Sequence, residues 1–397
     1  MAMDTNPKNL PSIIINNTIN FNISCPTIFY VIRENTHTFF DFIVWNWKHD
    51  PETNEWTGVF SRTLWKLSQT DKEIKYQVLG SLQTSISNEE IPSFVEKKKN
   101  KKKANVRIEK TEDNVPKEDK DILRNYLRLD VQLAPLYEDW TRKDPVFKEA
   151  AENFYGIRML NQEPVENLFS FICSQNNHIS RISTMIEKLC TNYGQKICKH
   201  NGNTYYSFPT VESISDVKVE SKLRELGFGY RAKFIQQSAA KIMEWGDDKW
   251  FRSLENMPYA SAKAELIKLP GVGAKVADCI CLMSLNHLEA LPVDTHVYQI
   301  ASQNYLPHLR GLKSVTDRVY NEIGDHFRAL YGDKAGWAHT VSVTPYPVLE
   351  SATDWVFFFT LGSTHWALRK IISLRTRHLL TRNSNIFFCI LAVVSVG

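Results

Sequence analysis

The chain has 397 residues, of which 43% are hydrophobic and 23% charged, as in soluble globular proteins with two or three domains. A net charge of +4 permits a nucleic-acid partner without requiring one. The seven cysteines show no paired framework and no Cys-x-x-Cys spacing, which favours reduced thiols and excludes standard zinc and iron–sulfur motifs. No secretory signal pattern is present, and the apolar run 386–396 is shorter than the about 18 residues that span a bilayer, so we expect no membrane segment.

The N-terminal part favours extended structure. Residues 1–57 contain no glycine and are rich in Asn, Ile, Thr and Phe. The segments WTGVFSRTLWKLSQT and IKYQVLGSLQ alternate apolar and polar residues, which predicts half-buried antiparallel strands. We predict a β-rich domain over 1–119, with a disordered lysine-rich insertion at about 96–118. The KKKNKKK run in that insertion is either a nuclear-import or phosphate-binding patch or a solvated charge run.

Helical periodicity replaces the alternation from Lys120 to about Tyr331, where apolar residues recur at i, i+3, i+4 and i+7. We therefore predict an α+β fold, with an N-terminal antiparallel sheet domain followed by an all-helical domain over 120–340. The tail 341–397 follows no recognisable pattern, and disorder is one interpretation of it.

A helical hairpin is predicted around the sequence LPGVG. A helix over 261–269 stops at a proline, Gly271, Val272 and Gly273 form a turn, and a second helix runs from Ala274 to about Leu285. Glycines let backbone N–H groups approach a partner closely, and unpaired N–H groups at a helix start favour an anion such as a DNA phosphate. The same sequence is also compatible with a simple interhelical turn.

The second helix combines an apolar stripe with a lysine. Val276, Ile280 and Met283 share one face, and Lys275 and Cys279 form an i, i+4 pair on an adjacent face. A lysine at a helix start is poorly placed for the helix dipole, and a solvated surface lysine is the ordinary interpretation. Partial burial at this electropositive end would favour the neutral amine that a nucleophile needs.

Nineteen residues after the lysine, Asp294 follows a Pro-Val bend and precedes the helical stretch THVYQIASQNY. By default such an aspartate is an N-cap, whose carboxylate accepts hydrogen bonds from helix N–H groups. This structural role does not exclude a catalytic one, because a carboxylate fixed at a cleft can stabilise developing positive charge.

Four segments together resemble one family. LFSFICSQNNHISRI, LGFGYRAKF, LPGVGAKVADCICLM and PVDTH occur in the order found in eukaryotic 8-oxoguanine DNA glycosylase/AP lyases of the helix-hairpin-helix superfamily. The resemblance runs from Trp56 to Ala338, interrupted by the lysine-rich insertion. It implies a bifunctional base-excision repair enzyme that removes 8-oxoguanine opposite cytosine. The implied partner is double-stranded DNA containing an oxidised purine or an abasic site, with no metal or cofactor, no membrane, a monomeric state and a location in the nucleus or also the mitochondrion.

The resemblance assigns the reactive pair and part of the pocket. Lys275 would attack the sugar C1′, displace the base and form a Schiff base, and β-elimination would then cut the strand. Asp294 would stabilise the oxocarbenium-like transition state and orient Lys275. Cys279 and Met283 would face the extruded base.

The resemblance also assigns the residues that would compensate for base extrusion. Asn176, Arg181 and Arg231 would contact the orphaned cytosine, Tyr230 would enter the gap, and His296 would touch a phosphate. Each has an ordinary alternative: a helix-capping asparagine, solvated helix arginines, a surface aromatic on a turn, and a core or surface histidine.

Two departures concern recognition of the base. The family reads the lesion through a glycine carbonyl in its N-terminal domain, whereas no glycine precedes Gly58 here. His339 stands at the position of a pocket glutamine and Val343 at that of an aromatic residue, and Pro345 and Pro347 would end any helix. We therefore expect lyase activity on abasic sites to survive better than excision of 8-oxoguanine. The alternatives are a catalytically impaired form that binds damaged DNA and an enzyme for another oxidised or alkylated purine.

Overall fold

The computed structural model describes most of the chain between the first strand of the sheet and the end of the last helix. The ranges described are 15–20, 47–69, 73–82, 119–312 and 314–343. They all lie in the first of two compact units, Met1–Tyr346. The lysine-rich insertion at 96–118 and the tail from residue 344 lie outside them, so the domain boundaries stay predictions.

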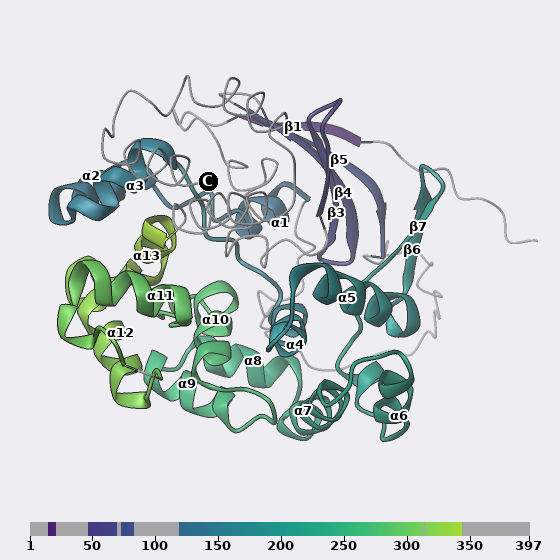
Figure 1. Cartoon of the computed structure of the whole chain (residues 1–397). Helices are drawn as coiled ribbons and strands as arrows, with labels where there is room; N and C mark the ends of the chain where they lie inside the picture. Colours follow the sequence, from purple (N-terminus) through teal and green to yellow (C-terminus); the bar gives the residue numbers. More distant parts are fainter. Residues whose placement is uncertain (1–14, 21–46, 70–72, 83–118, 313, 344–397) are drawn as a thin grey trace, which may run out of the picture. The chain divides into compact units, whose positions relative to one another are not determined.

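A five-stranded antiparallel sheet forms the N-terminal part, as predicted (Figure 1). Its strand order is β1-β5-β4-β3-β2, with bounds β1 Ile15–Asn20, β2 Trp47–Asp50, β3 Glu55–Phe60, β4 Thr63–Gln69 and β5 Glu73–Ser81. The first alternating segment makes both β3 and β4, because Ser61 and Arg62 have φ values of 48° and 55° and form a two-residue turn between them. Positive φ at both central residues gives a turn whose twist matches that of the two strands.

The sheet buries its inner face against α1 (Asp119–Tyr126) and the residues that follow it. Trp65, with no exposed surface, anchors this core, and its indole N–H donates to the carbonyl of Phe60 at 3.0 Å. The indole N–H of Trp47 donates to the hydroxyl of Tyr126 at 3.1 Å. The carbonyl of Tyr126 accepts from the N–H of Asn161, which ties the sheet to the chain leading into the helices.

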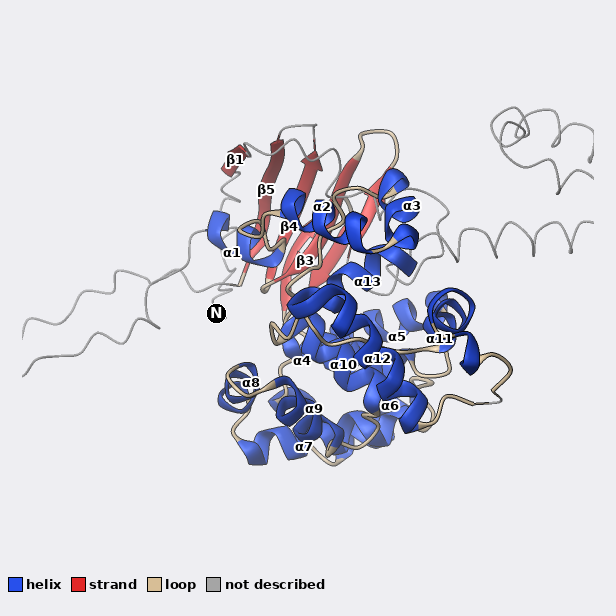
Figure 2. Ribbon diagram, turned by 90° about the vertical axis from the view of Figure 1, so that its left-hand side faces the viewer, coloured by secondary structure: helices blue, strands red, loops and turns tan. Residues whose placement is uncertain are grey.

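Helices make up most of the remaining described chain (Figure 2). Their bounds are α2 Leu133–Lys143, α3 Pro145–Asn153, α4 Pro164–Ser174, α5 Ile179–Tyr193, α6 Lys218–Glu225, α7 Arg231–Trp245, α8 Asp248–Glu255, α9 Tyr259–Ile267, α10 Ala274–Ser284, α11 Thr295–Ile300, α12 Asp317–Tyr331 and α13 Ala335–Val343. No helix within these described ranges is long and apolar enough to cross a bilayer.

One element was not predicted. A two-stranded hairpin, β6 (Lys196–His200) and β7 (Asn203–Tyr206), interrupts the helical part, which is therefore not all-helical as expected. Its turn is Asn201-Gly202, with φ values of 46° and 77°. Asn-Gly between two short strands is a strong hairpin signal, so this dipeptide could have revealed the element.

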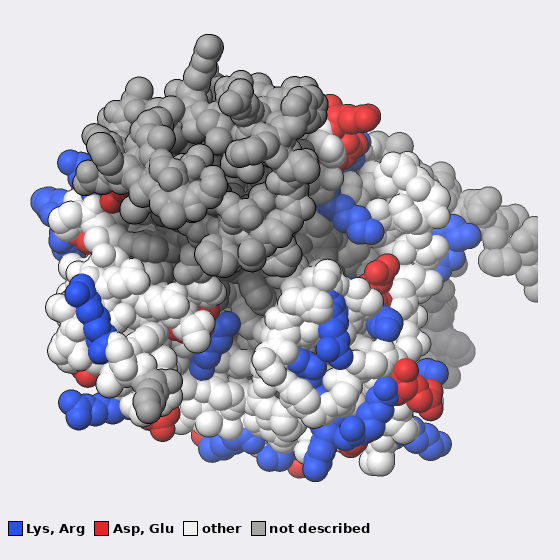
Figure 3. Space-filling view, viewed as in Figure 1, with Lys and Arg blue, Asp and Glu red and all other residues white. Residues whose placement is uncertain are grey.

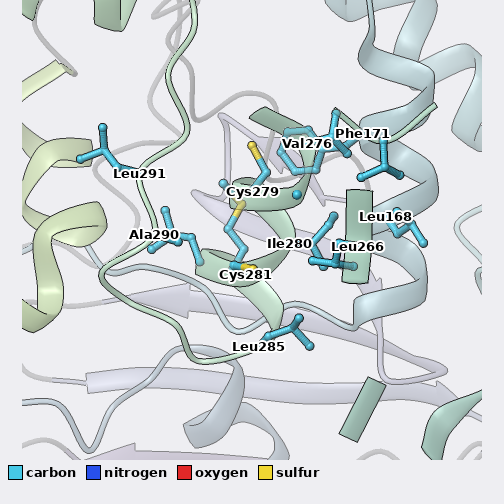
Figure 4. Packing of buried hydrophobic residues seen from close by; sticks show 14 of the residues in the cluster. Leu168, Phe171, Leu266, Val276, Cys279, Ile280, Cys281, Leu285, Ala290 and Leu291 are labelled. Atoms are coloured by element: carbon cyan, nitrogen blue, oxygen red, sulfur yellow. The ribbon is translucent and has the colours of Figure 1, made fainter. Parts of the chain in front are cut away.

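The core of the helical part surrounds α10. All nine residues from Val276 to Ser284 are buried, and α4 and α9 pack directly against the helix. Figure 4 shows Leu168 and Phe171 on one side of α10, and Ala290 and Leu291 on the other. Because α10 is enclosed on all sides, its first turn is the part of the helix that can meet a ligand.

The last described helix, α13, packs closely on the loop after α10. The N–H of Gly336 donates to the carbonyl of Leu288 at 2.9 Å, and a Cβ at position 336 would lie 2.0 Å from the carbonyl oxygen of Ala290. The indole N–H of Trp337 donates to the carbonyl of Ile157 at 3.0 Å. A glycine is therefore required at 336 for α13 to reach its place.

We predict that Gly336→Ala lowers the free energy of unfolding by about 3 kcal/mol, because backbone must move to admit the methyl group. Urea unfolding followed by circular dichroism measures this loss. Gly324→Ala is the matched control: it also lies in a helix, but its Cβ would meet only the movable guanidinium of Arg328. The control should be neutral or stabilising by about 0.5–1 kcal/mol, and equal losses in the two variants would contradict the prediction.

Candidate active site

The predicted helical hairpin is present, formed by α9, a short turn and α10. Gly271 has φ of +80°, and a Cβ there would lie 2.6 Å from the Phe234 ring, so the turn needs glycine at this position. Val272 is buried and anchors the turn, whereas Gly273 faces open space. The N-cap residue of α10 is Gly273, which has no side chain to cap the helix start. The first-turn N–H groups of this helix therefore suit an anion.

The predicted reactive pair lies at this helix start. The Nζ of Lys275 is 4.0 Å from Oδ2 of Asp294 and 5.5 Å from the centre of the Phe171 ring. Both side chains are partly exposed, at 31% and 20%. The amine is thus held against a carboxylate and an aromatic face while one side remains open to solvent.

Asp294 is the N-cap of α11, which confirms the structural role predicted for it. Its Oδ1 accepts from the N–H groups of His296 and Val297 at 3.1 and 3.0 Å. Only Oδ2 faces Lys275. The capping bonds fix the orientation of the carboxylate, so the second oxygen keeps a constant position beside the amine.

The proposed pocket residues on α10 are fully buried. Burial raises the pKa of the Cys279 thiol to about 12, with the nearby Lys275 opposing the shift, so the thiol stays protonated. Met283 lies at the far end of the helix, and its carbonyl accepts from the N–H of Gln162 at 2.8 Å. Cys279, one turn from Lys275, is the nearer of the two to the amine along the helix.

His339 on α13 is buried, with its ring packed edge-on against Phe327 at 4.7 Å. Burial lowers the pKa of its imidazole to about 4, although the charge of Asp294 acts in the opposite direction. Within the described residues its Nε2 has no hydrogen-bond partner. A neutral imidazole with an unused polar atom therefore stands on the same side of the fold as Asp294.

Two loops bring three of the other predicted residues together. Arg231 is buried, which rules out a solvated helix arginine, and it donates to the carbonyls of Gln175 and Asn176. Tyr230 is 47% exposed, and its hydroxyl donates to the same Gln175 carbonyl at 3.2 Å. Asn176 is exposed in a left-handed conformation, with φ of 46°. The α4–α5 and α6–α7 loops are thereby joined beside an exposed aromatic ring.

Sequence reasoning missed Gln175. Its side-chain amide donates to the carbonyl of Gly271 at 2.5 Å, so one residue links the hairpin turn to the loop that carries Asn176. Arg181 donates to the carbonyl of Gly227 at 3.2 Å and thereby tightens the same pair of loops. His296 is exposed next to Asp294. The position of Gln175 directly before Asn176 was the only signal for it in the sequence.

The charge of the surface agrees with an anionic partner. Figure 3 shows Lys and Arg side chains along the lower edge of this face, over the region of α6, α7 and α9, with fewer acidic side chains between them. Within the described residues no group of three His, Cys, Asp or Glu side chains is arranged to hold a metal ion.

Comparisons with known proteins agree with this geometry. Residues 37–168 match the family described as 8-oxoguanine DNA glycosylase, N-terminal domain. Residues 169–322 match the family described as HhH-GPD superfamily base excision DNA repair protein. The two matches follow each other along the chain, so its N-terminal part and its helical part each resemble a domain of base-excision DNA glycosylases.

Two relatives are 40% identical to this chain. They are N-glycosylase/DNA lyase OGG1 of Arabidopsis thaliana, over 228 residues, and the N-glycosylase/DNA lyase of Saccharomyces cerevisiae, over 243 residues. The alignments cover 57% and 55% of this chain, and the chain spans 62% and 64% of the length of those relatives.

Among solved structures, the apo form of Clostridium acetobutylicum 8-oxoguanine glycosylase/lyase superposes with a TM-score of 0.60 at 24% identity, covering 77% of this chain and 90% of that one. MBOgg1 in complex with a low-affinity DNA ligand gives 0.62 at 23% identity, covering 88% and 100%. Because both sequence identities are below 25%, these two comparisons support the fold and nothing further.

We predict that His339 makes folding pH-dependent. Its pKa is about 4 in the folded chain against about 6.5 when unfolded, so the unfolded chain binds the extra proton first as pH falls. Above pH 6.5 the neutral imidazole does not oppose folding. As the pH falls to 4, the free energy of unfolding decreases by about 3 kcal/mol, because the unfolded chain gains stability from the proton. Urea unfolding at pH 7 and pH 4 measures the loss of unfolding free energy between the two pH values. This loss should be smaller in His339→Gln than in the wild type by that amount. Equal sensitivity in both proteins would contradict the prediction.

Proposed function

We propose that the chain is a bifunctional DNA N-glycosylase/AP lyase of base-excision repair that removes 8-oxoguanine opposite cytosine. The observation that carries this proposal is the Lys275 amine, 4.0 Å from the Asp294 carboxylate, at the start of α10, whose N-cap residue is a glycine. The hairpin would hold a backbone phosphate next to the amine without reading the base.

The chemistry requires a neutral amine as the nucleophile and a carboxylate beside it. The lone pair of the Lys275 amine attacks C1′ of the flipped nucleotide, and the C1′–N bond breaks with its electron pair leaving on the base. The nitrogen loses a proton and the ring oxygen gains one, which opens the sugar to an iminium. β-Elimination then removes a proton from C2′ and breaks the C3′–O bond, whose electron pair leaves on the 3′ phosphate. Because the Oδ2 of Asp294 is 4.0 Å from the amine that attacks C1′, it would lie near the carbon that becomes positive, where a fixed carboxylate stabilises the transition state.

The joined loops account for the orphaned partner base. An enzyme that acts at C1′ must fill the gap left by the extruded nucleotide. The exposed ring of Tyr230 suits that role. Asn176 and Arg181 would contact the cytosine, and Arg231 would do so while its bonds to the loop carbonyls keep the loop in place.

The partner we propose is double-stranded DNA with an oxidised purine or an abasic site. The basic edge in Figure 3 supports it, because phosphate contacts supply most of the affinity of such proteins. We also propose that the chain acts as a monomer in the nucleus. Sedimentation and microscopy of a tagged chain test these two points.

We predict that borohydride traps a covalent adduct between the wild-type chain and an abasic duplex, because the Schiff base of Lys275 is reducible. Lys275→Gln should give no adduct, while Asp294→Asn, which keeps a capping oxygen, should slow trapping by about 100-fold. Denaturing gels of the cross-linked DNA measure both effects.

Lys148→Gln, which removes an exposed lysine of α3, is the control and should trap at the wild-type rate. Thermal unfolding of all four proteins establishes that each is folded. An adduct that persists undiminished in Lys275→Gln, or a folded wild type that gives none, would overturn the assignment of the nucleophile.

A second candidate function is an abasic-site lyase with impaired base excision. The observation in its favour is the His339 imidazole, which stands where the family has an amide and whose Nε2 is unpaired among the described residues. The reactive pair does not depend on that residue, whereas base recognition does.

We predict that the chain cuts abasic duplexes faster than it excises 8-oxoguanine, with His339→Gln raising the excision rate alone. Single-turnover assays with 8-oxoguanine, an abasic site and an alkylpurine, each opposite cytosine, measure these rates. Excision of 8-oxoguanine as fast as abasic cleavage would leave the bifunctional enzyme as the answer. Faster excision of the alkylpurine would replace 8-oxoguanine as the proposed substrate.

A further inference from the structure

A second charged residue on α10 lies outside the reactive pair. Asp278 has no exposed surface, yet it stands in the middle of an apolar helix. A buried carboxylate is stable only when it is fully hydrogen-bonded or paired with a cation. An isolated Asp in the run VADCICLM is a sequence signal of such a partner, and sequence reasoning did not use it.

Three side chains meet the Asp278 carboxylate. The hydroxyl of Tyr259 donates to Oδ1 at 2.6 Å, and the ammonium of Lys263 pairs with Oδ2 at 2.8 Å. The hydroxyl of Tyr320, from α12, donates to Oδ2 at 2.5 Å. The carboxylate thereby ties both helices of the hairpin to α12.

Tyr320 extends this network towards the reactive pair. Its hydroxyl oxygen accepts from the N–H of Val293 at 3.2 Å and lies 3.4 Å from the carbonyl oxygen of Leu291. Burial raises the pKa of this phenol and the charge of Asp278 raises it further, so it keeps the proton that it donates to the carboxylate. The oxygen is then an acceptor for Val293.

Val293 is the residue before Asp294, and the segment 290–294 that carries both has no regular secondary structure. The capping bonds of Asp294 fix its carboxylate relative to α11. They do not fix α11 relative to α10, on which Lys275 stands. The bond between Tyr320 and Val293 does this, because the other end of the network is a side chain of α10 itself.

We propose that Tyr320 is a positioning residue, which through its hydroxyl bridge from Asp278 to Val293 sets the distance between the Asp294 carboxylate and the Lys275 amine. The inference rests on the proposed function, since it presumes that this pair is reactive. A shift of about 1 Å in a reacting group can cost a large part of the rate. Loss of the bridge therefore affects the chemical step and leaves the DNA-binding hairpin in place.

The test is Tyr320→Phe, which removes only the hydroxyl. Trapping of the abasic adduct by borohydride under single-turnover conditions should slow by about tenfold or more, while the Kd for an uncleavable abasic-analogue duplex changes less than twofold. A crystal structure or fluorescence-based stability measurement of the variant reports whether the fold is retained.

Tyr137→Phe is the matched control. Tyr137 is also buried, and its hydroxyl also accepts from a backbone N–H, that of Ile157 at 3.1 Å, and donates to a carbonyl, that of Phe154 at 3.2 Å. It should lose comparable stability and keep the wild-type trapping rate. This comparison separates positioning from simple destabilisation.

The outcomes are distinct. Slow trapping in Tyr320→Phe with unchanged Kd, and normal trapping in Tyr137→Phe, supports the positioning role. Equal rates in Tyr320→Phe and wild type, or equal slowing in both variants, overturns it while the proposed function stands. A folded wild type that forms no adduct overturns the proposed function and the inference with it.

Discussion

The burial of α10 is the constraint from which the site follows. A helix enclosed along nearly its whole length can carry charge only where a partner is built in or where it reaches the surface. Asp278 meets the first condition through two tyrosines and a lysine. Lys275 meets the second at the open first turn, and there its neighbour is the Asp294 carboxylate. The same enclosed helix thus holds one buried residue, Asp278, whose carboxylate is paired within the fold, and one partly exposed residue, Lys275, for which we propose a reactive role.

The proposed reactive pair and the proposed base pocket depend on different parts of the chain. Lys275 and Asp294 are fixed by the hairpin and by the N-terminus of α11, both within the region matched to base excision repair proteins. His339 comes from α13, which starts beyond that region and reaches its place through the close packing of Gly336. Under the proposed function, change in the last helix would therefore alter which base is accepted while the amine and carboxylate remain as they are.

Alternation of apolar and polar residues predicted β3, β4 and β5, helical periodicity predicted the helices, and the proline and glycines of LPGVG predicted the helical hairpin, because each signal is local. The capping role of Asp294 was equally local. What spacing could not reveal was contact between distant segments, such as the 42-residue separation between Asp278 and Tyr320 or the link from Gln175 to Gly271. The burial of Arg231 was missed for the same reason, since its partners are carbonyls of another loop. The hairpin β6–β7 was different, because its Asn-Gly turn was visible in the sequence.

The two oxygens of Asp294 have separate tasks, and this limits which residues can stand there. Oδ1 is committed to the first turn of α11, and Oδ2 is directed at the amine. Glutamate would bring a carboxylate but is a poor cap, and serine would cap but has no charge. Aspartate alone combines a short side chain with two equivalent oxygens. The geometry of a helix start and the proposed role beside a sugar carbon therefore both require an aspartate at this position.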